Sequence, residues 1–168
     1  MPPDYYLKQG SGLDRALLLR FLQRTYQELC PQSHLGHLAT TAEQYFSGRT
    51  PIWWVEWQNP HPDPTVRRGL LEQVAGKGHT VKVGCLWMGS AVDQCHGDRH
   101  SHIFLLYVDP EHRRQGLGRA LMQTAETWAK KQGDRQITLQ VFVNNAAALT
   151  LYKNLGYEPQ SMTFGKAL

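Results

Sequence analysis

Three arginines lie close together in a short segment that also carries two glycines. Arg113, Arg114 and Arg119 fall within seven residues, and no acidic residue lies among them. A helical pattern begins at Leu117, so these cations surround a helix start, where free backbone N–H groups already carry about half a positive charge. Each cation there should cost roughly 0.3–1 kcal/mol of stability. The arrangement therefore predicts that an anion binds at this helix start.

The two glycines, Gly116 and Gly118, favour a bound phosphate over the alternative, a solvated basic turn. A residue without a Cβ lets the backbone turn sharply and approach a ligand closely. A strand, a glycine-containing turn and a helix start together make a phosphate site of backbone donors. Two nucleotide motifs are disfavoured: Leu121 stands where a dinucleotide fingerprint needs its third glycine, and the Gly-Lys-Ser/Thr of a P-loop is absent.

The elements on either side of this turn follow from the hydropathy pattern. Residues 103–108 are apolar without alternation, which is typical of a central strand buried on both faces, and Asp109-Pro110 ends the run. Helical spacing of apolar residues then continues from Leu117 to Trp128, and Gly133 follows the helix end. The arginine turn is thus expected between a buried strand and an amphipathic helix.

The rest of the chain predicts one mixed α/β domain over residues 1–168. After a strand over 137–143, a helix is capped by Asn144-Asn145 and closed by Gly156, and residues 157–164 leave room for a last strand or two. The earlier elements are a strand at 4–8, a helix of about four turns from Leu13, a helix from Thr40 or Thr41 to about Phe46, and strands at 52–57 and 81–92. The proline-rich connection 59–80, with a helical turn at 70–74, has no assigned role.

Composition narrows the class of protein. The 168 residues carry 18 Lys and Arg against 14 Asp and Glu, 41% are apolar and 19% are charged, so a folded domain is expected rather than a disordered chain. The longest apolar run is 103–108, far shorter than the roughly 20 residues of a membrane span. Three widely spaced cysteines, Cys30, Cys85 and Cys95, favour the reducing cytoplasm over a disulfide framework. We expect a cytoplasmic protein that binds no membrane.

Two other ligand classes are disfavoured. Zinc ligands usually come at short intervals from two elements, whereas Cys95, His96, His100 and His102 all lie at the turn between two strands. We therefore expect no metal. Nucleic acid is disfavoured because the basic excess is concentrated in one turn, and no stripe of basic and aromatic residues extends from it.

Two motifs resemble those of the GCN5-related N-acetyltransferase (GNAT) superfamily. Arg113-x-x-Gly116-x-Gly118, after a strand that ends in Val108-Asp109-Pro110, resembles the acetyl-CoA pyrophosphate loop of that family. The segment from Asn144 to Glu158 is similar to the family's N-x-x-A-x-x-L-Y-x-x-x-G-F motif. Both motifs stand in the right order and in the right elements. The resemblance implies the GNAT-like acyl-CoA N-acyltransferase fold, with a central mixed, mostly antiparallel sheet flanked by helices.

The resemblance also implies a binding mode for acetyl-CoA as co-substrate. Backbone groups of the strand would pair with the pantetheine arm, and the turn would hold the pyrophosphate. Asn145 corresponds to an asparagine that contacts the cofactor, although capping its helix is an equally good role. The positions implied for cofactor binding are Leu106, Tyr107, Val108, Arg113, Arg114, Gln115, Gly116, Leu117, Gly118, Arg119 and Asn145.

The implied reaction is direct attack of a primary amine on the thioester. Tyr152 matches the tyrosine that protonates the departing thiolate, and its alternative role is a half-buried aromatic on a helix face. Family members that acetylate peptide α-amines often carry Glu where Gln140 stands, and an amide cannot act as a base. This departure disfavours acetylation of the ribosomal-protein type. Glu56 is the substitute candidate, acting directly or through water, and its alternative role is an exposed strand residue.

The acceptor is left open as a small-molecule or peptide amine. In this fold the first helices and the connecting loops usually recognise it, and the candidate side chains include Tyr26, Glu28, His34 and Tyr45. The oligomeric state is left open: dimers are common in the superfamily, so the resemblance allows a homodimer, but the residues themselves do not indicate one. The alternative function is a non-catalytic acyl-CoA-binding or sensory module, which Gln140 favours.

Overall fold

The computed structural model describes residues 1–32, 34–58, 80–93 and 95–166. Its elements, in chain order, are β1 (Tyr5–Gln9), η1 (Gly12–Asp14), α1 (Arg15–Leu29), α2 (His37–Tyr45), β2 (Ile52–Gln58), β3 (Thr80–Val92), β4 (Arg99–Val108), η3 (Pro110–His112), α3 (Leu117–Lys131), β5 (Ile137–Leu139) and α4 (Ala146–Asn154). Nearly all of the proline-rich connection, with the helical turn predicted at 70–74, lies outside the described residues.

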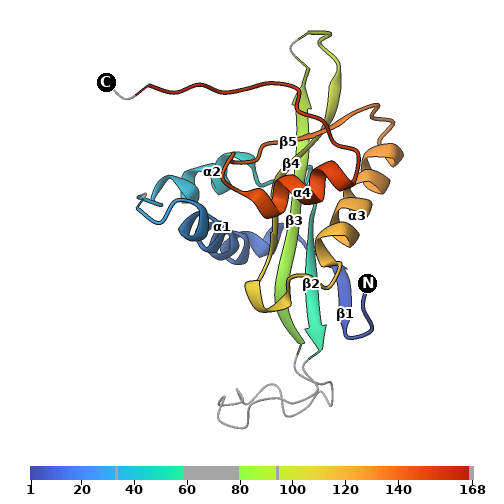
Figure 1. Cartoon of the computed structure of the whole chain (residues 1–168). Helices are drawn as coiled ribbons and strands as arrows, with labels where there is room; N and C mark the ends of the chain where they lie inside the picture. The colour runs from blue at the N-terminus through green and yellow to red at the C-terminus, as the bar shows by residue number, and fades with distance from the viewer. Residues whose placement is uncertain (33, 59–79, 94, 167–168) are drawn as a thin grey trace.

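The strands form one five-stranded sheet in the order β1-β2-β3-β4-β5 (Figure 1). The first three pairings are antiparallel, and only β4 and β5 run parallel. The predicted mixed, mostly antiparallel sheet is therefore confirmed. β3 and β4 form the long hairpin at its centre, as expected for the apolar run at 103–108.

Helices cover both faces of the sheet (Figure 1). α1 and α2 pack on one face, where Leu18, Phe21 and Leu38 meet Trp54 and Tyr107. α3 and α4 pack on the other face, and the core there contains Leu117, Leu121, Tyr152, Val55 and Ile103. Large apolar side chains are thus removed from water on both sides, which is the main stabilisation of such a layered domain.

Three predicted elements differ from the structure. α2 begins at His37, before Thr40 and Thr41, with Gly36 as its N-cap and no capping side chain. The strand predicted over 137–143 ends at Leu139, because the chain then leaves β4 and has no strand to pair with. No strand forms among the described residues 157–166: Tyr157 still packs on the core, and the chain beyond it extends away from the domain with Met162 and Phe164 exposed (Figure 1).

No helix in the described ranges combines the length and the apolarity that crossing a membrane requires.

Side chains reinforce the short pairing of β4 with β5. The hydroxyl of Thr138 on β5 lies 2.9 Å from Nε2 of His100 and 2.8 Å from Nδ1 of His102 on β4. The hydroxyl of buried Ser101 donates to Asp134, which follows α3. A threonine hydroxyl has one proton to donate, so both hydrogen bonds can form when one imidazole nitrogen is unprotonated and accepts that proton while the other nitrogen donates to the hydroxyl oxygen. Burial and, secondarily, the nearby His100 lower the pKa of His102.

Protonation of His102 should therefore loosen the fold in mildly acidic solution. A histidine with a lowered pKa in the folded state gains its proton more readily in the unfolded chain, so the free energy of unfolding should fall as the pH drops below about 6.5. Denaturant unfolding at a series of pH values from about 8 to about 5.5 measures the slope of the free energy of unfolding against pH. The slope should be smaller in His102→Asn, which keeps a polar group but does not titrate; equal slopes in both proteins would contradict the assignment.

Candidate active site

The two parallel strands part after three pairs of residues. Ser101 to Ile103 of β4 pair with Ile137 to Leu139 of β5, and β4 then continues to Val108. Beyond Ile103 this edge of β4 has no neighbouring strand in the described part of the chain. We call the opening between residues 104–108 and the chain after Leu139 the splay. Apart from the carbonyl of Val108, which accepts from Nε of Arg113, the backbone groups of β4 that face this opening can bind an extended ligand.

A β-bulge at Phe104 produces the splay. Trp87 of β3 is paired with Leu105 and Met88 with Ile103, so Phe104 is an extra residue in β4. Bulges bend a strand and end its pairing, and they are common beside active sites. The ring of Phe104 fits here because Gly89 has no Cβ in the space that the ring occupies.

Alternation along β4 decides which peptide groups face the splay. The N–H of Asp109 donates to the carbonyl of Val83 on β3, so the alternate residues Tyr107 and Leu105 also turn their peptide groups toward β3. Leu106 and Val108 then turn theirs toward the splay. Of the three strand residues implied for the pantetheine arm, Leu106 leaves both of its peptide groups toward the splay and Val108 leaves its N–H, because the Val108 carbonyl accepts from Nε of Arg113. The peptide groups of Tyr107 belong to the ladder with β3.

The turn after β4 has the backbone of an anion site. Arg114 and Gly116 both adopt left-handed conformations, with φ of 64° and 81°. Gly116 is the N-cap of α3 and supplies no capping side chain, so the first-turn N–H groups of the helix are left for another acceptor. A Cβ on Gly116 would meet no atom within 4 Å, so its role is conformational. We call residues 113–119 the cradle.

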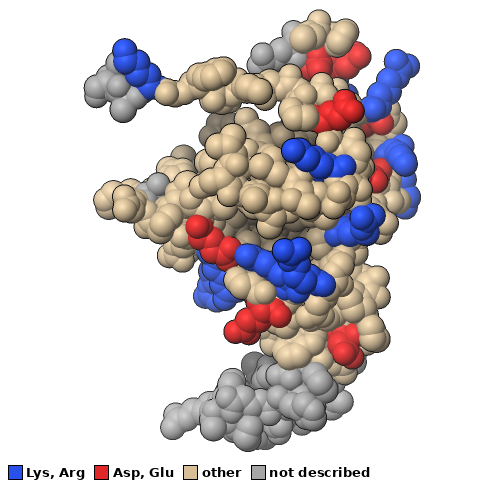
Figure 2. Space-filling model, in the orientation of Figure 1, with Lys and Arg blue, Asp and Glu red and all other residues tan. Residues whose placement is uncertain are grey.

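Basic side chains gather over the cradle on the face shown in Figure 2, with acidic side chains beside them. Within the described residues, the guanidinium of Arg113 is the one in the cradle that makes side-chain hydrogen bonds to other parts of the chain. Its Nε donates to the carbonyl of Val108 at 2.8 Å, and its Nη2 lies 2.7 Å from the carboxylate of Glu28. No ion pair of Arg114 or Arg119 occurs among the described residues.

Gly118 has a packing role that the pattern of glycines did not indicate. A Cβ at this position would lie 3.1 Å from Cδ2 of Leu151 on α4. The glycine therefore allows α4 to pack closely on the first turn of α3. The expected close approach is thus made by a neighbouring helix.

α4 carries the two remaining motif residues, and Tyr152 belongs to the core cluster that contains Val108 of β4 and on which Leu106 packs. Asn145 caps the helix, since its side chain accepts from the N–H of Ala148 at 3.2 Å. Its contact with a cofactor stays a prediction. Tyr152 is buried, with 9% of its surface exposed, and burial raises its pKa to about 12. Among the described residues none accepts a hydrogen bond from its hydroxyl, so that proton is available.

Glu56 does not lie beside the splay. It belongs to β2, which is two strands away from β4, a separation of roughly 10 Å. Its carboxylate lies 3.7 Å from Nζ of Lys8 and 3.7 Å from Nζ of Lys82. A role as the base stays a prediction and, at this spacing, would act through water.

Glu28 is the carboxylate that the structure brings to β4. Oε1 accepts from the hydroxyl of Tyr107 at 2.9 Å, and Oε2 accepts from Arg113. The sequence placed Glu28 only among the candidates for acceptor recognition. Its position in the last turn of α1 was the available signal, because an acidic residue there opposes the helix dipole.

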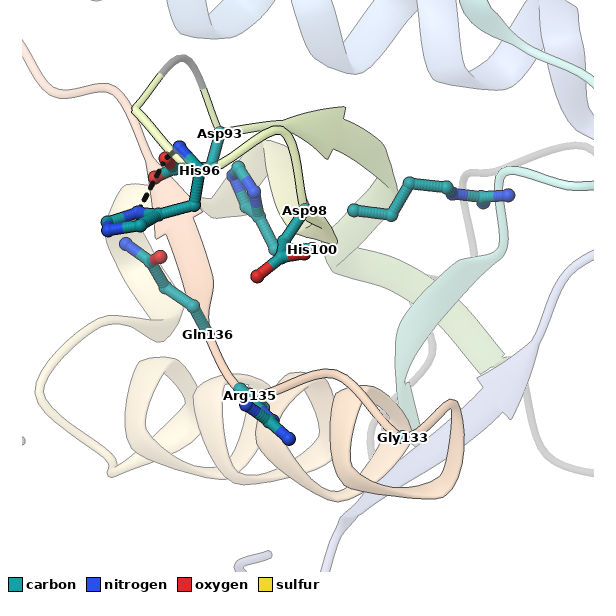
Figure 3. Close-up of a pocket in the computed structure, with 8 residues that line it drawn as sticks. Asp93, His96, Asp98, His100, Gly133, Arg135 and Gln136 are labelled. Carbon is teal, nitrogen blue, oxygen red and sulfur yellow. Dashed lines mark hydrogen bonds and ion pairs between the residues drawn. The ribbon is translucent and has the colours of Figure 1, made fainter.

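A separate pocket lies at the other end of α3 (Figure 3). It has a volume of about 380 Å³ and is lined by Asp93, His96, Asp98, Arg99, His100, Gly133, Arg135 and Gln136. The ring of His96 lies 3.1 Å from the carboxylate of Asp93. In the parts of the chain that the structure describes, no three His, Cys, Asp or Glu side chains are grouped to hold a metal. The cradle is at the opposite end of the helix, so the pocket is not part of the candidate active site.

Comparison with known proteins points to one family. Residues 22–157 match the sequence model of the acetyltransferase (GNAT) family. An uncharacterized N-acetyltransferase of Methanocaldococcus jannaschii is 34% identical over 85 residues, which cover 51% of this chain and 36% of that protein. The ribosomal protein bS18-alanine N-acetyltransferase of Escherichia coli is 44% identical over 55 residues, or 33% of this chain and 37% of that enzyme. The matched segments thus span about a third of these relatives' length.

Solved structures share the fold. An aminoglycoside acetyltransferase from an uncultured soil metagenomic sample has a TM-score of 0.68 at 14% identity, covering 99% of this chain and 98% of its own. A GCN5-related N-acetyltransferase of Ralstonia eutropha also has a TM-score of 0.68, at 18% identity, covering 97% and 98%. At these identities the likeness concerns the fold.

The left-handed backbone at Arg114 should lower the stability of the fold, while its side chain contributes to anion binding. A non-glycine residue in the left-handed region costs about 1 kcal/mol or more, so Arg114→Gly should raise the melting temperature by roughly 2–4 °C. The same change removes a cation and should weaken binding of CoA. Thermal unfolding and calorimetric titration measure the two effects.

Gly116→Ala is the matched control, because it places a Cβ at the other left-handed position. It should lower the melting temperature by a similar amount. If Arg114→Gly lowered the melting temperature instead, the strain assigned to Arg114 would be refuted.

Proposed function

Because the chain belongs to the acetyltransferase (GNAT) family, we propose that it is an N-acetyltransferase that moves an acetyl group from acetyl-CoA to a primary amine. The observation that carries the proposal is the junction of the splay with the cradle. The open backbone edge of β4 leads directly, through η3, to the uncapped start of α3.

The residues present fit acetyl-CoA. Its diphosphate matches a helix start with free N–H groups and three arginines. Its pantetheine arm carries amides that can pair with the peptide groups of Leu106 and with the N–H of Val108 as an added strand would. When bound, it supplies an activated acyl thioester. The cradle would hold the anionic end, and the strand edge would orient the arm along β4.

The chain's own groups would then act on the reacting atoms. The amine attacks the thioester carbonyl as the C–N bond forms, the C–S bond breaks, and the surplus proton of the amine goes to solvent or to a base. The N–H of Val108 faces the splay and is placed to stabilise the developing oxyanion. In the proposed reaction the hydroxyl of Tyr152 acts as the donor to the departing sulfur.

Burial of Tyr152 defines what kind of donor it is. A phenol whose pKa is about 12 stays protonated at neutral pH, but it is a weaker acid than a thiol of ordinary pKa near 8.5. Complete proton transfer to the thiolate is therefore uphill. A hydrogen bond from the hydroxyl stabilises the leaving sulfur without requiring that transfer.

Tyr152→Phe should lower kcat about a hundred-fold and leave the Kd for acetyl-CoA nearly unchanged, because it removes only the donor. Steady-state kinetics and calorimetry measure the two constants. Tyr157→Phe is the control: its ring packs 6.1 Å from Tyr152, but its hydroxyl donates to Glu126. It should change kcat less than about two-fold. Unchanged turnover in Tyr152→Phe would remove this tyrosine from the mechanism.

A sensory module that binds acyl-CoA without turnover is the second candidate, and Gln140 is the observation that favours it. Release of free thiol from acetyl-CoA, measured with a panel of primary amines, separates the two functions. An enzyme releases thiol in proportion to the acetylated amine. A sensor binds acetyl-CoA and releases none.

A further inference from the structure

The last turn of α1 carries an acid where the physics of the helix disfavours one. Carbonyl groups at a helix C-terminus carry about half a negative charge and favour cations, and α1 has no basic residue in its last turn. Glu28 lies there instead. Another positive charge must therefore offset both the carboxylate and the helix end.

In the structure that charge comes from the cradle. Arg113 donates to Oε2 of Glu28 at 2.7 Å, while the hydroxyl of Tyr107 donates to Oε1 at 2.9 Å. The other nearby cation, Arg24, lies 3.2 Å from Asp109 and is already paired. If Arg113 moved away, Glu28 would remain as an uncompensated carboxylate that Tyr107 still holds in place.

The carboxylate lies at the mouth of the splay. Tyr107 belongs to the part of β4 that β5 has left, and Tyr26, on the same turn of α1, packs its ring 6.3 Å from that of Phe142, beyond β5. The last turn of α1 therefore bridges the two strands as they separate. The side chain of Glu28 is 37% exposed, so a ligand entering from solvent can reach it.

Arg113 has two hydrogen-bond partners in the structure, the carboxylate of Glu28 and the carbonyl of Val108. It is the first arginine of the cradle, and in the absence of a diphosphate its guanidinium is on Glu28. The exposed ion pair contributes at most about 1 kcal/mol, so a diphosphate with two or more negative charges can compete with Glu28 for the guanidinium, whose Nε also donates to the carbonyl of Val108.

We propose that Glu28 binds a positively charged group of the acceptor, and that Arg113 blocks this site until the diphosphate of the cofactor draws its guanidinium away from Glu28. The inference rests on the proposed function and assigns its substrate class: an amine that carries a second cationic group besides the nitrogen that reacts. Cofactor and acceptor binding are then coupled, and each raises the affinity of the other by the same factor.

Calorimetric titration of the full chain tests the substrate class. The probes are 1,5-diaminopentane and 5-aminopentan-1-ol, which differ only in the second cation. With CoA at saturation, the wild type should bind the diamine roughly ten-fold more tightly, as expected for one charged hydrogen bond. Glu28→Gln should bind both probes equally and should bind CoA at least as tightly as the wild type. The control Glu43→Gln, which removes an exposed acid of α2, should keep the ten-fold preference.

A second titration tests the blocking arginine without any cofactor. Arg113→Gln, free of CoA, should bind the diamine about as tightly as the CoA-bound wild type does, or roughly ten-fold more tightly than the CoA-free wild type. No gain in this variant would overturn the blocking role. A preference for the diamine that survives in Glu28→Gln would overturn the site.

The two proposals fail in different ways. A wild-type protein that binds no CoA contradicts the proposed function. A wild type that binds CoA but does not distinguish the two probes contradicts only the inference about Glu28.

Discussion

β4 has one residue more than β3 between the pairs Trp87–Leu105 and Met88–Ile103, and the geometry of the site follows from that residue. Because Phe104 is extra, Ile103 and Leu105 contribute to opposite cores although they are two residues apart. The strand bends at the same point, and β5 stops pairing at Leu139. The open edge and the direction in which Tyr107 points toward α1 are consequences of the same bulge.

Two helices carry charges that oppose their dipoles, and the structure brings these charges together. α3 begins among arginines and α1 ends at Glu28, and each placement is unfavourable for its own helix. The contact between Arg113 and Glu28 partly relieves both. This ion pair is easily replaced, because an anion bound at the start of α3 and a cation bound at the end of α1 would compensate the two helix dipoles separately.

Local patterns were sufficient for the elements whose signals lie within a few residues. The structure confirms the buried strand at 103–108, the helix from Leu117 and the cap at Asn145. Each of these was indicated by residues inside the element or next to it: the apolar pattern, the flanking glycine or the capping asparagine. The short β5 could not be predicted, since its end depends on a bulge in another strand. Glu28 could not be assigned its contacts either, because Tyr107 and Arg113 are 79 and 85 residues away in the chain.

Gly118 connects the binding and the chemical halves of the site. It lies in the first turn of α3, inside the cradle, and its missing Cβ lets Leu151 of α4 come within contact of that turn. Tyr152 is the next residue, so this helix contact is one of those that hold the proposed proton donor near the cradle, together with the shared core and the hydrogen bond from Tyr157 to Glu126. Enzymatic rates are sensitive to displacements of about 1 Å at the reacting groups. The glycine that resembles a phosphate-loop residue thus also contributes to the packing of the helix that carries Tyr152.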